Sequence, residues 1–427
     1  AEPLLSFPNG ALVHFAVSNS NVRMTTQLVG AMTRFLPFNR GNPTAAGSSA
    51  AGNPPNPLGH PTAYLWETVW ERASWLDIVG RYLIPQRDTK KQIKALIFPR
   101  YHQLDVTRKL INAVLHDGAG GKYLIQHSAG SGKTNSIAWS AHFLADLHDA
   151  QSQKLFDTVL VVSDRTVLDG QLQDAIFAFE RTTGVVATIK GESNSKSGEL
   201  AAALKGGKKI VVCTIQTFPF ALKAVQELAA TQGKRFAVIA DEAHSSQTGE
   251  AAAKLKQVLS AEDLQDVADG GDVSAEDLLA AQLAHQMANR TDAAGITYVA
   301  FTATPKAKTL ELFGRRPNLA LPASADNLPA PFHVYSMQQA IEEGFILDVL
   351  QNYTSFDLAF KLAHAGEAQA ENQAENQAEE PPHAFNDEEV ERKEATKQIL
   401  RWVKLNPHNI AKKVEIIIEH FREAIAP

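Results

Sequence analysis

Residues 122–136 read KYLIQHSAGSGKTNS, and this stretch decides the fold. An apolar run leads into a glycine-rich turn and then into a helical pattern, which is the setting of a phosphate-binding loop. Gly130 and Gly132, with Ser131 between them, would let backbone N–H groups turn toward a phosphate. Lys133 would reach the β- and γ-phosphates, and the Thr134 hydroxyl would bind Mg²⁺.

One position departs from the loop pattern G-x-x-x-x-G-K-[ST]. The first glycine is replaced by His127, while the core GSGKT is intact. Taken alone, this core also occurs in proteins that do not bind nucleotides, so the partner motifs further along the chain carry the interpretation.

Short apolar runs alternate with helical patterns after residue 97. The strand candidates are KYLIQH, DTVLVVS, KKIVVCTI, RFAVIADEA and GITYVAFTAT, and stretches such as NSIAWSAHFLADLHD and DGQLQDAIFAFE separate them. This alternation predicts an α/β fold with a mostly parallel sheet flanked by helices.

A second motif, VIADEAHSS, ends a hydrophobic strand in an acidic pair. Asp241 could hold Mg²⁺ through water, and Glu242 could polarise an attacking water, with His244 two residues beyond. The alternative is a polar strand end without a catalytic role. The phosphate-loop pattern about a hundred residues upstream favours the catalytic interpretation.

Further polar residues gather at other predicted strand ends. In FTATPK, Thr302, Ala303 and Thr304 lie at the carboxyl edge of the sheet, where open α/β sheets bind ligands, although a strand running into a proline turn would look the same. Candidate donors to polynucleotide phosphates are Ser163, Arg165, Thr166, Thr214, Gln216 and Thr217, each of which could also be ordinary loop chemistry.

Upstream of the loop, FPRYHQLDVTRKL offers groups suited to a nucleobase. Arg100, Tyr101 and Gln103 precede or begin a helix, and an aromatic ring and a planar amide can stack on and read an adenine.

Composition limits the classes of protein. With a formal net charge of −6, a nucleic-acid partner requires a local basic patch. The single cysteine, Cys213, excludes internal disulfides and fits a reducing cytoplasm. No window reaches the ~18 apolar residues of a membrane span. The chain begins AEPLLSFPNG without Met or a signal peptide and ends FREAIAP, so we expect an excerpt of a longer protein.

Outside the alternating region the pattern is less regular. Residues 41–61 are rich in Gly, Pro, Asn and Ser and predict a mobile loop. Residues 63–83 carry three tryptophans at near-helical spacing and predict a packed helix pair. Residues 260–292 read as an acidic helical insertion, interpreted as a solvated arm, and residues 364–395 as a low-complexity insertion.

In this order and spacing, GSGKT, VVSDRTVLDGQL, VVCTIQTF, IADEAHSSQTG and AFTATPK resemble the first motor lobe of superfamily 2 helicases. The exact residues of these motifs, together with IFPRYHQLDVTRKL, resemble the restriction (R, motor) subunit of type I restriction–modification enzymes. The resemblance covers nearly the whole chain. It implies a subunit with a nuclease domain, two RecA-like lobes and a helical domain, which pulls duplex DNA at the expense of ATP and cleaves it far from the recognition sequence.

The resemblance also implies roles for residues and partners. Lys133 and Thr134 would contact phosphate and Mg²⁺, and Asp241 and Glu242 would be the hydrolytic pair. Thr302 and Thr304 would be the coupling element, and Gln103 the adenine reader. The implied partners are double-stranded DNA and the modification (methyltransferase) and specificity subunits.

The implied domains follow from what each segment contains. The family's nuclease needs an Asp and a Glu-x-Lys pair, which residues 1–95 lack, so they are expected to be the end of a nuclease domain and a connector. Residues 96–325 would be the first lobe and residues 326–427 the start of an incomplete second. Two alternatives stay open: a superfamily 2 helicase or remodeller-type motor without a nuclease, or a nucleotide- and DNA-binding module with negligible hydrolysis.

Overall fold

The computed structural model describes residues 3–5, 7–44, 47–87, 90, 92–163, 166–180, 184–189, 203–204, 206–214, 218–241, 295–305, 307–316, 318, 321, 324, 327–348, 410–411, 414–415 and 418. The chain divides into two units, residues 1–346 and residues 347–427. Every strand and helix named below lies in the first unit.

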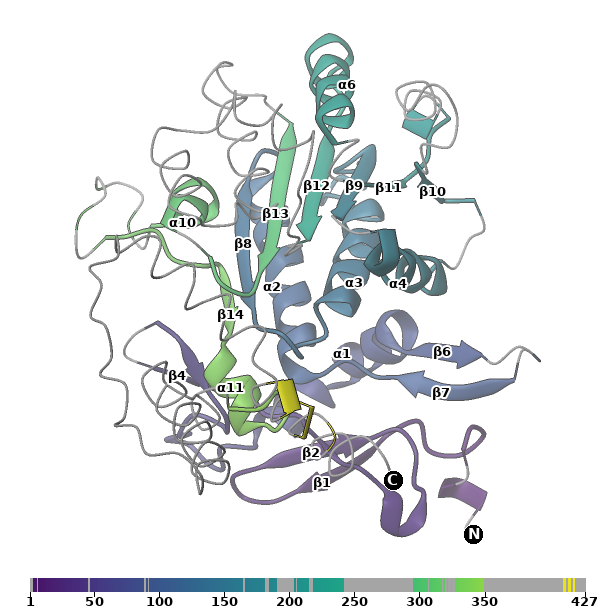
Figure 1. The fold of residues 1–427 in the computed structure, drawn as a ribbon, viewed down its shortest axis with the longest axis vertical. Helices are drawn as coiled ribbons and strands as arrows, with labels where there is room; N and C mark the ends of the chain where they lie inside the picture. The colour runs from purple at the N-terminus through teal and green to yellow at the C-terminus, as the bar shows by residue number, and fades with distance from the viewer. Residues whose placement is uncertain are drawn as a thin grey trace, which may run out of the picture. The chain divides into compact units, whose positions relative to one another are not determined.

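A parallel sheet forms the centre of the first unit, and seven strands of it lie in the described residues (Figure 1). In spatial order they are β10 (Val186–Thr188), β11 (Ile210–Thr214), β9 (Thr158–Ser163), β12 (Phe236–Asp241), β13 (Ile296–Thr302), β8 (Lys122–His127) and β14 (His333–Tyr335). Each neighbouring pair is parallel. The predicted α/β class with a parallel sheet is therefore confirmed.

The strands are mostly apolar because both faces of the sheet are covered. Val161 of β9 packs with α2 (Tyr101–Asp117), α3 (Lys133–Ala145) and α4 (Thr166–Ala178) on one face. Its neighbour Leu160 packs on the other face with α6 (Phe218–Gln232) and α10 (Ala307–Phe313). Full burial of such a side chain contributes about 1.5–3 kcal/mol to the free energy of unfolding. Because successive side chains of a strand point to opposite faces, each strand contributes to both layers.

The N-terminal part of the chain shares one core with this lobe. It contains an antiparallel sheet of β1 (His14–Val17), β2 (Val22–Thr25) and β3 (Leu36–Pro37), and two strand pairs, β4 (Asn42–Pro43) with β5 (Ser49–Ala50) and β6 (Ile84–Arg87) with β7 (Ile93–Ile97). Its helical segments are η1 (Pro3–Leu5), η2 (Gly30–Met32), η3 (Leu65–Val69), α1 (Arg72–Asp77) and η4 (Ile78–Tyr82). Aromatic contacts join it to α2: the Tyr101 ring lies 5.0 Å from the Tyr64 ring and 5.8 Å from the Phe38 ring.

The segment predicted to be a mobile loop, residues 41–61, contains the β4–β5 hairpin instead. Hydrogen bonds made by its polar side chains help to stabilise this segment. Asn42 donates to the Ala51 carbonyl at 2.8 Å, and the Arg40 amide donates to Asn53 at 2.8 Å. The hairpin also bonds to α11 (Met337–Glu342): the Ser336 amide donates to the Ser49 hydroxyl at 3.0 Å.

The tryptophan-rich stretch is helical, but only Trp75 of its three tryptophans packs against the core as predicted. Trp66 and Trp70 remain 44% and 43% exposed, whereas Leu65 and Val69 are buried. The reason is the helical period of this stretch: η3 and η4 are π-helical, so the buried face is displaced from the one that a 3.6-residue period gives.

The structure differs from the predicted lobe boundary at residue 325. β14 pairs in parallel with β8, with Tyr335 opposite His127, and so extends the sheet of the first lobe. Residues 326–346 therefore belong with the first unit. The expected insertions at residues 260–292 and 364–395 lie outside the described residues. Among the described residues, no helix is long and apolar enough to cross a membrane.

Candidate functional site

The glycine-rich loop joins β8 to α3 in a backbone conformation that favours glycine. Gly130 has φ +72° and Gly132 has φ +74°, both in the left-handed region. Gly132 is the N-cap of α3, and Lys133 and Thr134 occupy the first turn of this 13-residue helix. Backbone N–H groups and the positive end of the helix dipole therefore meet where the loop ends, as an anion site requires.

Gln103 holds the loop from the side. Its buried amide donates to the carbonyl oxygens of Ser131 at 3.2 Å and Gly132 at 3.0 Å. Its side-chain oxygen accepts the Arg100 backbone N–H at 2.9 Å, which completes the capping of α2. A Cβ added at Gly132 would lie only 2.6 Å from the Gln103 amide nitrogen, so the close approach depends on glycine.

Arg100 and His102 brace the same loop. Arg100 Nη2 donates to the Gly130 carbonyl at 2.8 Å, and its guanidinium carbon lies 4.2 Å from the centre of the Phe345 ring. Burial lowers the pKa of Arg100. His102 Nε2 donates to the Ser131 carbonyl at 2.9 Å. Every loop carbonyl from Gly130 to Gly132 thus has a partner on α2 or its cap.

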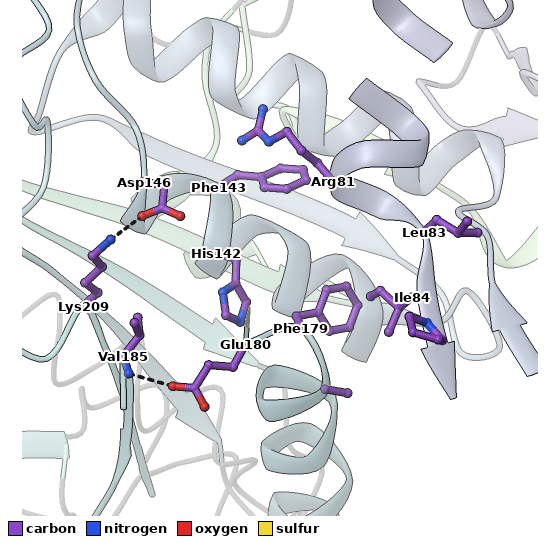
Figure 2. Close-up of a pocket in the computed structure, with 12 residues that line it drawn as sticks. Arg81, Leu83, Ile84, His142, Phe143, Asp146, Phe179, Glu180, Val185 and Lys209 are labelled. Atoms are coloured by element: carbon purple, nitrogen blue, oxygen red, sulfur yellow. Dashed lines mark hydrogen bonds and ion pairs between the residues drawn. The ribbon is translucent and has the colours of Figure 1, made fainter. Parts of the chain in front are cut away.

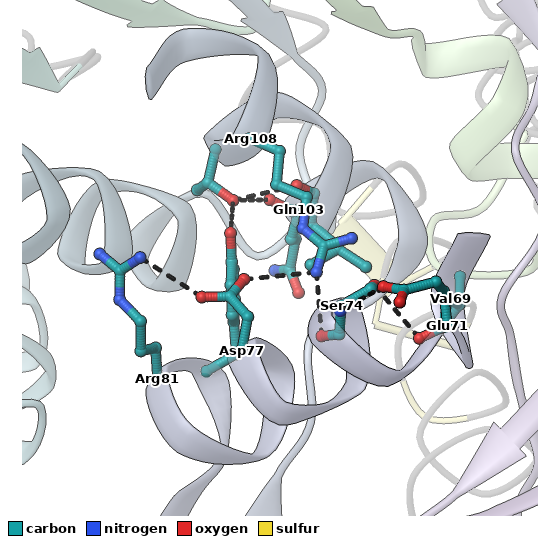
Figure 3. A network of polar contacts seen from close by, with 10 residues as sticks. Val69, Glu71, Ser74, Asp77, Arg81, Gln103 and Arg108 are labelled. Carbon is teal, nitrogen blue, oxygen red and sulfur yellow. Dashed lines mark hydrogen bonds and ion pairs between the residues drawn. The ribbon is translucent and has the colours of Figure 1, made fainter. Parts of the chain in front are cut away.

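A network behind α2 fixes the helix that carries these groups (Figure 3). Arg108 donates to the Ser74 carbonyl at 3.2 Å and to Asp77 at 3.3 Å. Asp77 also accepts from Arg81 at 3.3 Å. One turn away, the Thr107 hydroxyl donates to the Gln103 carbonyl at 2.8 Å and pairs with the Tyr82 hydroxyl at 2.8 Å. Burial raises the pKa of Tyr82 to about 12, so this hydroxyl stays protonated.

A chain of polar side chains lies beneath the loop. His127 Nε2 and His333 Nδ1 are 2.9 Å apart, and His333 Nε2 lies 3.1 Å from Asp105. Asp105 also pairs with Lys109 at 2.7 Å. Burial lowers the pKa of His333 and places that of His127 well below its usual value, with the charge of His333 as a further cause. Burial raises the pKa of Asp105, but the hydrogen bonds with His333 and Lys109 outweigh it, and the net shift is downward.

The predicted acidic and coupling residues lie on strands adjacent to the loop. Asp241 ends β12, Thr302 ends β13, and His127 ends β8, so the three share the carboxyl edge in that order. Since neighbouring strands are about 4.8 Å apart, β12 and β8 are separated by roughly 10 Å. Thr302 is 1% exposed and Thr304 is exposed. Glu242 and His244 lie outside the described residues.

The predicted phosphate donors follow the next strands of the same edge. Ser163 ends β9 and is buried, and Thr214 ends β11 directly opposite it in the sheet register. Thr166 begins α4. Arg165, Gln216 and Thr217 fall outside the described residues, as do the side chains of Thr166 and Thr214. Of the six predicted phosphate donors, the structure therefore places the backbone of Ser163, Thr166 and Thr214 at the part of the carboxyl edge next to β12.

A cavity of about 240 Å³ opens next to the loop. It is lined by Arg100, Gln103, Gly132 and Asn135 and by residues of the N-terminal part, namely Met24, Thr25, Thr26, Leu36, Leu96, Ile97 and Phe98. Among the buried polar atoms near the loop that have no hydrogen-bond partner in the described residues are Arg100 Nη1 and the Ser131 hydroxyl. Both could donate to a ligand, so these residues fit a nucleotide better than an empty core.

A second cavity, of about 650 Å³, lies at the opposite end of α3 (Figure 2). Its charged groups already have partners: Lys209 pairs with Asp146 at 2.7 Å, and Glu180 accepts the Val185 N–H at 2.7 Å. Lys209 immediately precedes β11, so this cavity is at the amino edge of the sheet, away from the edge where such folds bind ligands.

Residues that the sequence analysis missed are His102, His333 and Asp105. In the described part of the chain no group of three or more His, Cys, Asp or Glu side chains could hold a metal by itself. The position of His102 beside Gln103 was the available signal, since consecutive polar residues in a first helical turn often face a loop. No local signal links His333 to His127, which are 206 positions apart.

Residues 102–382 match the sequence profile of the SWI2/SNF2 ATPase family.

Similar solved structures include a fragment of an HsdR subunit of a type I restriction enzyme from Vibrio vulnificus YJ016, with 15% identity over 65% of this chain and 40% of that one, and a TM-score of 0.30. A hypothetical ATP-dependent RNA helicase from Sulfolobus tokodaii has 22% identity over 48% of each chain and a TM-score of 0.28. A nuclease-deletion mutant of the type ISP restriction-modification enzyme LlaGI, in complex with a DNA substrate mimic, has 14% identity over 64% of this chain and 22% of that one, and a TM-score of 0.31. The chain thus spans less than half the length of each. No curated protein matches it.

Proposed function

The chain belongs to the SWI2/SNF2 ATPase family, and on that premise we propose that it is the ATP-driven double-stranded DNA motor of a type I restriction endonuclease R subunit. In this proposal the whole subunit works in the cytoplasm with modification and specificity subunits. The motor pumps DNA toward the complex before non-specific cleavage, and the nuclease residues lie outside this chain. The ordered motif set supports the restriction assignment.

The observation that carries the proposal is the braced glycine loop at the N-terminus of α3. Its geometry supports binding of the ATP phosphates by the N–H groups of Gly130 to Gly132 and by Lys133. Thr134 and Asp241 would hold Mg²⁺, which neutralises phosphate charge when bound. Glu242 would orient the attacking water, with His244 beside it.

The adjacent 240 Å³ cavity supports an adenine site at Gln103. The amide N–H₂ of Gln103 is committed to the loop, but its oxygen accepts only one hydrogen bond and has a second lone pair. An adenine amino group could donate to that lone pair, and the unpaired Arg100 Nη1 could donate to a ring nitrogen. The cavity is a little smaller than the ~300–1,000 Å³ of whole-ligand sites, as suits a base alone.

The DNA track is proposed along the half of the carboxyl edge formed by β9 and β11. Its donors would be Ser163, Arg165, Thr166, Thr214, Gln216 and Thr217. Thr302 ends β13, the strand between the acidic strand β12 and the loop strand β8, and Ala303 and Thr304 follow it directly. This intermediate place supports a role in coupling hydrolysis to DNA movement. Because Thr302 is buried, it would act by holding the strand end, and the exposed Thr304 would make the outward contact.

A second candidate function concerns this chain by itself, as a nucleotide- and DNA-binding module with negligible hydrolysis. A Cβ at Gly130 would lie 3.0 Å from Ile346 and 3.3 Å from the Cβ of Phe345, so the segment after α11 lies close against the loop. In this candidate function that segment would cover the loop and slow the exchange of bound nucleotide. A remodeller-type motor without a nuclease is the remaining alternative, which the family match supports equally.

The test is steady-state ATP hydrolysis with and without duplex DNA, combined with displacement of a third strand from a triplex as a readout of translocation. We expect DNA-stimulated turnover in the full-length protein that is lost in Lys133→Ala. Lys209→Ala, at the opposite edge of the sheet, is the matched control and should turn over like the wild type. Turnover by Lys133→Ala would refute the proposal, and stimulation without triplex displacement would refute translocation.

A further inference from the structure

His127 occupies the position where phosphate loops have their first glycine, and its side chain is wholly buried. Its ring lies 5.4 Å from the His102 ring and 6.2 Å from the Phe301 ring, measured between centroids. Its Nε2 is bonded to His333, whereas its Nδ1 has no hydrogen-bond partner among the described residues. A buried imidazole nitrogen without a partner is costly, which indicates a function beyond packing.

The direction of the hydrogen bonds along this chain follows from its acidic end. The Asp105 carboxylate accepts hydrogen bonds only, so His333 donates from Nε2. Burial favours neutral imidazoles, since it lowers the pKa values of both histidines. The Nδ1 of a neutral His333 then accepts, His127 donates from Nε2, and the Nδ1 of His127 is left as a bare acceptor pointing into the core beneath the loop.

The same chain joins the elements that touch the loop. Asp105 lies two residues after Gln103 on α2, the helix that braces Ser131 and Gly132. His333 lies on β14, which leads through α11 to Phe345 and Ile346 against Gly130. His127 itself begins the loop. A shift of the loop entrance can therefore reach both the brace and the covering segment, through the two hydrogen bonds of His333 and then along α2 and β14.

We propose that Asp105, His333 and His127 form a positioning chain that fixes the entrance of the phosphate loop in place of the first glycine and transmits phosphate occupancy to β14. This inference rests on the proposed ATP site. The bare Nδ1 of His127 is the end of the chain nearest the loop. It is the atom whose surroundings change first when the loop closes on a phosphate.

The first test reads the histidines directly, by long-range ¹H–¹⁵N correlation on ¹⁵N-histidine-labelled full chain, assigned with single variants. Without nucleotide, His127 and His333 should both be neutral Nε2–H tautomers. Mg·ADP should shift the Nδ1 resonance of His127 and, more weakly, that of His333, with no shift in Lys133→Ala. A protonated or Nδ1–H His127, or resonances unmoved by Mg·ADP that binds, would overturn the inference.

The second test separates the two bonds of His333 with variants that keep one each. Asn places an oxygen where His333 has Nδ1 and can keep the bond to His127; Gln places a nitrogen where it has Nε2 and can keep the bond to Asp105. We expect His333→Gln and His333→Phe to raise the KM for ATP about tenfold, the equivalent of one net hydrogen bond, with a smaller change in kcat. His333→Asn should stay within about threefold of the wild type.

Controls keep the outcomes distinct. His60→Asn replaces an exposed histidine and should match the wild type, and thermal unfolding of each variant checks that it folds. Equal effects of the Asn and Gln variants would overturn the chain. If the wild type neither binds Mg·ADP nor hydrolyses ATP, the proposed function and the transmission to β14 fail together. The tautomers of the nucleotide-free protein then still decide whether the chain exists.

Discussion

Gln103 donates a hydrogen bond from its side-chain amide to the carbonyl oxygen of Gly132 across 3.0 Å. This bond joins the first turn of α2 to the N-cap of α3. The same amide donates a second hydrogen bond to the Ser131 carbonyl. The start of α2 and the end of the glycine loop therefore move as one body. Any ligand that engages Gln103 engages the loop as well.

Replacement of Gln103 with Ala should weaken ATP binding. The change removes one donor from each of two loop carbonyls and leaves the Arg100 N–H without its side-chain acceptor. An unsatisfied buried polar group costs about 1–3 kcal/mol, which corresponds to a rise of roughly 5- to 150-fold in the Kd for ATP. Titration with a fluorescent ATP analogue measures it. Gln151→Ala, at an exposed loop position, should bind normally. Unchanged affinity in Gln103→Ala would show that the brace is dispensable.

The two left-handed glycines Gly132 and Gly233 offer a matched pair. Each has positive φ, +74° and +63°, so an Ala at either should lose about 1–2 kcal/mol of the free energy of unfolding. A Cβ at Gly132 would also lie 2.6 Å from the Gln103 side chain and 2.9 Å from the Arg100 side chain. A Cβ at Gly233 would have no neighbouring heavy atom within 4 Å. Urea unfolding should show a loss in both variants, and only Gly132→Ala should lose nucleotide binding. Normal binding in that variant would contradict the geometry.

The free energy of unfolding should fall as the pH drops below about 6.5, the ordinary pKa of histidine. Burial lowers the pKa values of His102 and His127 well below that value, with the charges of Arg100 and His333, respectively, as further causes. In this window the unfolded chain binds protons that the folded chain does not. The stability from these groups is complete above pH 6.5 and decreases toward lower pH, by at most about 1.4 kcal/mol per pH unit for each histidine.

Chemical unfolding at a series of pH values between 7.5 and 5 measures this slope. Asp105 does not interfere, because its lowered pKa removes stability only at more acidic pH. His127→Gln should flatten the profile, while His60→Gln, at an exposed position, should run parallel to the wild type. Constant stability across the range would mean that these histidines bind protons equally in the folded and unfolded states, which contradicts the lowered pKa values.

Binding of duplex DNA should weaken steeply with salt. The chain carries a formal net charge of −6, so attraction must come from local cationic groups, and log K should fall against log[salt] with a slope of about −0.9 for each phosphate neutralised. Fluorescence anisotropy with a labelled duplex gives the slope. Arg165→Ala should reduce its magnitude by about one, and Lys133→Ala, at the nucleotide loop, should leave it unchanged. A flat response would exclude contact with the DNA backbone.

The parallel sheet was predictable because burial on both faces leaves an unmistakable pattern. TVLVVS and ITYVAFT are mostly apolar, and every residue of both strands is buried. The loop between Gly130 and Lys133 was predictable for a similar reason, since few sequences meet its backbone requirements. In both cases neighbours in the sequence decide the structure.

What could not be predicted depends on contacts between distant residues. The burial of Thr302 is set by adjacent strands, and the bond of His127 to His333 closes only after β14 joins the sheet. The hairpin at residues 42–50 forms through side-chain amides and hydroxyls, which composition alone assigns to a loop. Trp66 and Trp70 face outward because π-helical turns change which residues share a face.

The hairpin has a consequence for anyone who wishes to isolate this ATPase domain. Ser49 and Ser336 are bonded across 287 positions, and the Ala51 N–H donates to Glu342 at 2.6 Å, so the first residues of the chain act as a clasp on α11. A truncated protein that starts at residue 96 would retain the complete parallel sheet yet lose the clasp, the walls of the base cavity and the aromatic partners of Tyr101. We therefore expect the shortest piece that keeps this fold to begin before the hairpin, far upstream of the glycine-rich loop.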